Sequence, residues 1–172
     1  NEIDNIRERL ISDFKINYIK NKLRILNIYN LGQKLNHRLY NISLGKKFTN
    51  GFIRNEHDVL EISDRDFIKQ NRVFGFKKVQ DNFQDYLIET FKNYNPNLLF
   101  FGHTNNIDLE TFDALKNINK NLIISQWNED PIMPSLKDSK LNIDKILKYK
   151  NYTDHTFITT DPSVFNKHDR NL

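Results

Sequence analysis

The side chains best suited to acid–base chemistry stand directly after short apolar runs of the sequence. His103 closes the run 98–103 (LLFFGH) and follows Gly102. An imidazole can act as a general base for a hydroxyl group when it titrates near neutrality and faces a cleft. The neighbouring glycine would let a ligand come close to the backbone. We predict His103 as a catalytic residue, and a histidine that only hydrogen-bonds a nearby loop is the equal alternative.

A second polar group follows the run 122–127 (LIISQW), which ends in the only tryptophan of the chain. An aromatic face can cover the apolar side of a sugar ring, while carboxylates and amides bind the sugar hydroxyls. A tryptophan packed into the core is the more frequent arrangement in general. We predict Asp130 as a second catalytic residue, and Trp127, Asn128 and Glu129 as substrate-binding residues.

Two further loops add candidate binding residues. Residues 30–38 (NLGQKLNHR) hold one glycine, so they lack the G-x-G-x-x-G pattern of a dinucleotide site. A helix start in this loop would favour a phosphate or a hydroxyl-rich ligand, and a solvated turn is the equal alternative. The hydroxyls after the run 155–160 (HTFITT) are explained as well by a turn or a helix cap. The predicted substrate-binding residues in these loops are Gly32, Asn36, His37, Arg38 and Thr160.

Other patterns are weaker or missing. Residues 63–66 (SDRD) carry two carboxylates where a nucleotide-binding sheet would hold a ribose, but helix capping or a local Asp–Arg pair is the favoured interpretation. The sequence contains no HExxH motif, no P-loop, no Gly-x-Ser-x-Gly elbow and no cysteine. We therefore predict no bound metal and no resident cofactor.

The elements that must position these loops are strands alternating with helices. Strand-length apolar runs occur at 23–30, 58–63, 98–103, 122–127 and 155–160. Helical spacing of apolar residues occurs within 3–18, 38–55, 83–94, 108–118 and 143–147. Residues 65–78 show no clear period. Such alternation predicts a doubly wound, Rossmann-like parallel sheet of about five strands with helices on both faces. The loops that carry the candidate residues would then lie close together at the carboxyl edge of the sheet.

Length and composition predict one α/β domain. We divide the chain into an N-terminal amphipathic helix (1–22), the α/β domain (23–165) and an exit segment (166–172). Without cysteine, a signal-peptide pattern or a run of about 18 apolar residues, the chain is expected to be cytoplasmic and without a transmembrane segment, which leaves peripheral membrane contact open. The net charge of +4 is spread among acidic residues, so we predict no nucleic-acid partner and keep nucleic-acid binding as a minor alternative.

The order of several segments resembles the N-terminal half of CgeB-like glycosyltransferases, a spore-maturation type related to group 1 glycosyltransferases. The segments that carry the resemblance are Phe52–Val59 (FIRNEHDV), Ser63–Asp66 (SDRD), Phe101–His103 (FGH), Gln126–Pro131 (QWNEDP) and Phe157–Thr160 (FITT). The resemblance extends from Leu23 to about Phe165. The first loop is poorer in glycine than is typical of that family.

The resemblance implies a GT-B fold, in which two Rossmann-like domains face one another across a cleft. Its N-terminal domain mainly holds the acceptor, and its C-terminal domain binds a nucleotide-sugar donor without a bound metal. By this resemblance, His103, Asp130 and the loop 32–38 would face the cleft. The donor would bind mainly to a second domain that these 172 residues do not include, so this part alone is expected to be inactive.

A non-catalytic α/β binding or regulatory domain of receiver-like topology is the main alternative. A receiver domain needs an acidic cluster after its first strand and an aspartate after its third. The sequence has Asn30 and His103 at those two places, which disfavours this alternative.

Overall fold

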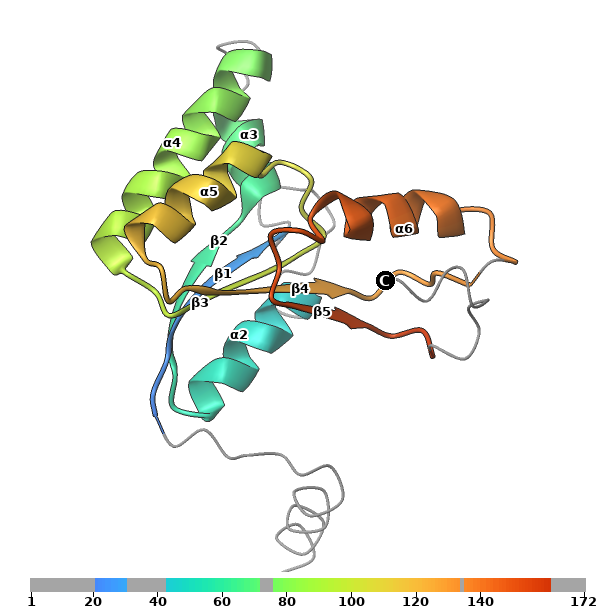
Figure 1. The fold of residues 1–172 in the computed structure, drawn as a ribbon, viewed down its shortest axis with the longest axis horizontal. Coiled ribbons are helices and arrows are strands. Elements are labelled where there is room, and N and C mark those ends of the chain that lie inside the picture. The colour runs from blue at the N-terminus through green and yellow to red at the C-terminus, as the bar shows by residue number, and fades with distance from the viewer. Residues whose placement is uncertain (1–20, 31–42, 72–75, 134, 162–172) are drawn as a thin grey trace, which may run out of the picture.

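A computed structural model describes residues 21–30, 43–71, 76–133 and 135–161. Strands and helices alternate along these residues (Figure 1). Their bounds are β1 Arg24–Tyr29, α2 Leu44–Arg54, β2 Asp58–Ile62, α3 Asp64–Asn71, α4 Phe76–Tyr94, β3 Leu98–Gly102, α5 Leu109–Ile118, β4 Ile123–Asn128, α6 Ser139–Lys148 and β5 His155–Ile158. The predicted N-terminal helix 1–22, the exit segment 166–172 and the loop residues 31–42 lie outside the described residues.

The strands form one parallel sheet in the order β2-β1-β3-β4-β5. Ile28 of β1 is paired with Ile62 of β2 on one side and with Phe101 of β3 on the other. The predicted Rossmann-like parallel sheet is therefore confirmed. Strand order reverses between β1 and β3, which is the place where doubly wound sheets usually bind their ligands.

Helices cover the two faces of the sheet unequally. α3, α4, α5 and α6 lie on one side, and α2 lies on the other (Figure 1). The main core lies under the first group, where Phe83, Phe101 and Phe112 are almost fully buried. On the α2 side, an apolar groove runs past α2 towards β5, and Phe157 of β5 remains 48% exposed.

α3 is an element that the sequence pattern did not predict. Its eight residues (DRDFIKQN) include only two apolar side chains, so no helical stripe is visible. The helix begins after Ser63, whose carbonyl accepts the Phe67 N–H at 3.1 Å and whose hydroxyl lies 2.6 Å from an Asp66 carboxylate oxygen. The start of α4 at Phe76 was also not predicted. It lies within residues 65–78, which show no clear period, and the helical spacing becomes clear only further along the chain.

Candidate functional site

The carboxyl ends of three neighbouring strands meet at one edge of the sheet. Register pairs Tyr29 of β1 with Gly102 of β3, and Gly102 with Trp127 of β4. The residues that follow these positions are therefore close in space although they lie about 25 to 100 positions apart in the sequence. His103 and Glu129 are brought together in this way.

His103 and Glu129 form the centre of the candidate site. The Nε2 atom of His103 lies 2.7 Å from Oε1 of Glu129 and 3.7 Å from Oδ1 of Asp130. Burial alone would raise the pKa of Glu129, but hydrogen bonds from His103 and Tyr29 outweigh it and lower the pKa below its ordinary value. Glu129 is thus an ionised acceptor at neutral pH, and it is Glu129 rather than Asp130 that is within hydrogen-bonding distance of the imidazole.

Tyr29 is a residue of this site that the sequence interpretation missed. Its hydroxyl donates to Oε1 of Glu129 at 2.5 Å, and its ring meets the His103 ring edge-on at a centroid distance of 5.8 Å. Burial, and then the bond to Glu129, raises the pKa of Tyr29 far above its ordinary value, so the hydroxyl keeps its proton. The sequence did contain one indication of this role, because Tyr29 is the last residue of a strand and the other candidate residues also lie at strand ends.

The backbone at Gly102 and His103 is shaped by close packing. A Cβ atom on Gly102 would lie 2.7 Å from the Tyr29 ring and 2.9 Å from the Trp127 carbonyl oxygen. The expected space for a ligand above Gly102 is therefore occupied by Tyr29. His103 has a φ of 50°, a left-handed conformation that histidine adopts more readily than most residues.

The hydrogen bonds define which imidazole nitrogen is available for chemistry. A carboxylate can only accept, so the Nε2–H of His103 donates to Glu129. In a neutral ring the lone pair then lies on Nδ1, and the side chain is 23% exposed. The second oxygen of Glu129, Oε2, is buried and has no hydrogen-bond partner among the described residues. A base with a fixed tautomer can accept a hydrogen bond from a hydroxylated ligand at Nδ1.

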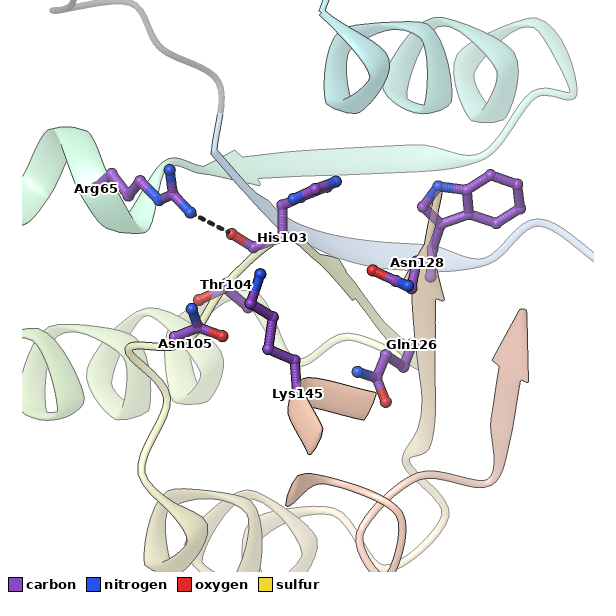
Figure 2. A pocket seen from close by; sticks show the side chains of 8 residues that line it. Arg65, His103, Thr104, Asn105, Gln126, Asn128 and Lys145 are labelled. Atoms are coloured by element: carbon purple, nitrogen blue, oxygen red, sulfur yellow. Dashed lines mark hydrogen bonds between the residues drawn. The ribbon is translucent and has the colours of Figure 1, made fainter. Parts of the chain in front are cut away.

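A polar pocket opens beside this centre (Figure 2). We call it the polar pocket throughout. It is lined by Arg65, His103, Thr104, Asn105, Gln126, Trp127, Asn128 and Lys145. Lys145 extends from α6 into the space at the ends of β3 and β4, and Arg65 of α3 donates to the His103 carbonyl oxygen at 3.4 Å (Figure 2). The pocket therefore combines groups from three elements, α3, β4 and α6, around the loop that carries His103.

A buried carboxylate holds the loop after β3 in place. Asp64, at the start of α3, is fully buried. One of its oxygens accepts from the Thr104 hydroxyl at 2.6 Å and from the Asn106 amide at 2.7 Å, and the other accepts from the Arg65 N–H at 2.7 Å. Asp66 accepts from Ser63 at the start of α3, whereas Asp64 binds the loop after β3, a long-range contact that none of the interpretations of 63–66 predicted.

The structure separates residues that were predicted to form one sugar-binding surface. Trp127 packs on the α2 side, edge-on to Phe48 at a centroid distance of 4.9 Å, where it lines the apolar groove. Asn128 is buried and its side-chain amide donates to the Asp130 carbonyl oxygen at 3.3 Å. Neighbouring strand residues point to opposite faces, so the Trp127 ring and the Asn128 amide point to different sides of the sheet, although both residues line the polar pocket.

The remaining predicted residues have other placements. The Thr160 hydroxyl accepts the Ile132 N–H at 3.2 Å and so joins the loop after β5 to the loop after β4. This contact joins two loops and is neither the turn nor the helix cap kept as the alternative, and the substrate-binding role of Thr160 stays a prediction. Four predicted residues lie outside the described part of the chain, and their role stays a prediction: Gly32, Asn36, His37 and Arg38.

The described residues contain no group of three or more His, Cys, Asp or Glu side chains arranged to hold a metal ion. Within the same residues, no helix combines the length and apolar character needed to cross a membrane.

No family model matches the chain, and comparisons with curated proteins and with solved structures find no match. The fold and the site geometry are therefore the basis for inferring a function.

Proposed function

We propose that this chain is the acceptor-side domain of a GT-B type glycosyltransferase, with His103 as the general base that takes a proton from an acceptor hydroxyl. The observation that best supports this proposal is the 2.7 Å contact between His103 Nε2 and Glu129 Oε1 at the carboxyl edge of the sheet. A sugar hydroxyl is a weak nucleophile, and a positioned base removes its proton as the hydroxyl oxygen bonds to the donor sugar. The bond between that sugar and the phosphate of the donor breaks in the same step, and the nucleotide leaves.

The neighbouring groups support this assignment. Glu129 fixes the imidazole tautomer and stabilises the imidazolium that forms when Nδ1 accepts the proton. Tyr29 holds Glu129 from the side of β1 through its hydroxyl at 2.5 Å. Glu129 and Tyr29 are thus positioning residues, and Asp130, 3.7 Å from the imidazole, adds a second negative charge nearby.

The proposal requires a second domain that binds the nucleotide-sugar donor. The test therefore uses the polypeptide of the complete reading frame, incubated with radiolabelled nucleotide sugars and an extract of the source cells as acceptor. His103→Asn is the preferred variant because asparagine tolerates the positive φ at this position. We expect transfer to fall by about 10²- to 10⁴-fold, while the dissociation constant of the donor stays unchanged.

Two more variants sharpen the test. Glu129→Gln keeps the shape but not the charge, and we expect a smaller loss, about 10- to 100-fold. His155→Asn changes an exposed histidine on β5 and should leave transfer intact. Normal turnover in His103→Asn would remove the histidine from the mechanism. A reading frame without a donor domain, together with no transfer from any nucleotide sugar, would instead favour the non-catalytic α/β binding domain.

A further inference from the structure

The polar pocket contains two cationic side chains for which no described residue supplies a counter-ion. Arg65 and Lys145 both line it (Figure 2), and neither forms an ion pair with any described residue. Their contacts are with neutral oxygens: Arg65 with the His103 carbonyl at 3.4 Å, and Lys145 with the Asn142 side chain at 3.3 Å. Most of the guanidinium donors and the ammonium group are thus available to a ligand.

The acidic side chains nearby, Asp64, Glu129 and Asp130, are not among the residues that line the pocket. Asp64 does not line it, and its two oxygens already accept from Thr104, Asn106 and the Arg65 backbone. Asp130 is also absent from the lining, and its carboxylate lies towards the imidazole of His103. The lining of the polar pocket is therefore positive, with amide groups between the two cations.

The enclosed part of the polar pocket has a volume of about 20 Å³. That space accommodates a small group rather than a whole sugar ring, because a single water molecule needs about 10–15 Å³ on the same measure. The charged end of a larger ligand would fit here, with the remainder of the ligand lying outside towards His103.

One amide that lines the polar pocket is buried and lacks a partner for its oxygen among the described residues. Gln126 is 5% exposed and lines the polar pocket, and its Oε1 has no hydrogen-bond partner among the described residues. Buried polar atoms in folded proteins are almost always paired. A ligand that pairs this oxygen must present an O–H or N–H group close to its negative charge.

We propose that the polar pocket binds the carboxylate or phosphate group of a hydroxylated anion. This proposal rests on the proposed function because it takes the anion to be the acceptor. Arg65 and Lys145 would hold the charged group of the acceptor, and one of its hydroxyls would be directed to His103. The acceptor class would then be an acidic sugar or a sugar phosphate.

The test is a titration of the ¹⁵N-labelled chain with glucose, glucuronate and glucose 6-phosphate, followed by NMR. Glucose and glucuronate differ by one carboxylate, and the phosphate ester distinguishes the two sources of charge. We expect at least one anion to shift the amides of residues 103–105 and to bind about fivefold or more tightly than glucose. The tighter of the two anions identifies the charged group.

Substitutions of the two cationic residues test whether the anion binds in the polar pocket. Arg65→Gln and Lys145→Gln should each weaken anion binding about fivefold. Arg54→Gln and Lys140→Gln remove exposed cations from α2 and α6 and should leave it unchanged. Anions that bind no better than glucose, or equally well to Arg65→Gln and Lys145→Gln, would overturn the proposal. Such a failure would leave the role of His103 untouched, because that role is tested by sugar transfer.

Discussion

The Tyr29 ring is enclosed on two sides by residues that have no side chain. A Cβ atom on Gly45 of α2 would lie 2.6 Å from the ring, and one on Gly102 of β3 would lie 2.7 Å from it. These distances are shorter than real carbon–carbon contacts allow. The two glycines therefore let the ring reach the strand edge, where its hydroxyl holds Glu129 beside His103.

Gly102→Ala tests this packing at the level of one residue. The added methyl group would meet both the Tyr29 ring and the Trp127 carbonyl oxygen, which belongs to the backbone and cannot move freely. We expect a loss of about 1–3 kcal/mol in the free energy of unfolding, measured by urea denaturation. A matched control is Gly51→Ala in α2, where the described residues place no atom within 4 Å of the new Cβ beyond the glycine's neighbours and the backbone of its own helix.

The control should change stability in the opposite direction. Alanine is favoured over glycine inside a helix by about 0.5–1 kcal/mol, so Gly51→Ala is expected to stabilise the chain. If Gly102→Ala were as stable as the native sequence, the Tyr29 ring could not be packed as described.

At the scale of elements, one carboxylate connects α5, β4 and the segment before β5. Asp154 accepts from the Ile124 N–H at 2.7 Å and from the Lys116 ammonium group at 3.0 Å. Its own N–H donates to the Ile124 carbonyl oxygen at 2.8 Å. Burial alone would raise the pKa of Asp154, but these hydrogen bonds outweigh it and lower the pKa below its ordinary value.

This lowered pKa predicts a pH-dependent contribution to stability. Because the folded-state pKa is below the unfolded value, the ionised carboxylate stabilises the fold above about pH 4, the ordinary value for aspartate. The contribution disappears as pH falls through the folded pKa. The stability advantage of the native chain over Asp154→Asn should thus be constant from pH 7 to 5 and shrink below pH 4, as measured by denaturant midpoints.

Asp144→Asn provides the control for that measurement. Asp144 is exposed on α6, so the difference between this variant and the native chain should be small at every pH. An advantage over Asp154→Asn that grew on acidification would contradict the proposed hydrogen bonds.

At the scale of the whole molecule, stability depends on the face of the sheet covered by α3, α4, α5 and α6. Phe101 of β3 is 1% exposed and packs against Phe112 and Tyr149 at centroid distances of 5.6 and 5.3 Å. On the opposite face, Phe157 of β5 is 48% exposed. The two phenylalanines thus offer a matched pair for measuring how unequally the faces contribute.

Phe101→Ala should destabilise the chain by about 3–5 kcal/mol, because it leaves a cavity in the main core. Phe157→Ala should change stability by roughly 0.5 kcal/mol or less, as exposed positions usually do. Thermal or urea unfolding followed by circular dichroism measures both. Equal losses in the two variants would mean that the α2 side of the sheet carries as much of the core as the other side.

The sequence by itself determined the fold class and the edge of the sheet at which to look. Apolar runs of strand length, separated by helical spacing, require crossover connections, and those connections impose a parallel sheet whose strand ends meet. Local periodicity carries this information, so strands β1 to β5 were predicted within two residues of their observed bounds. The short, polar α3 was missed because two apolar side chains cannot define a period.

Only the tertiary structure decided which side chains meet at that edge. Register placed Tyr29 next to Gly102 and brought Glu129, not Asp130, within hydrogen-bonding distance of His103. Because side chains alternate along β4, Trp127 and Asn128 point to opposite faces of the sheet. The position of α6 places Lys145 at the polar pocket. These contacts join residues far apart in the sequence, and their distances depend on strand pairing and helix packing that no local pattern encodes.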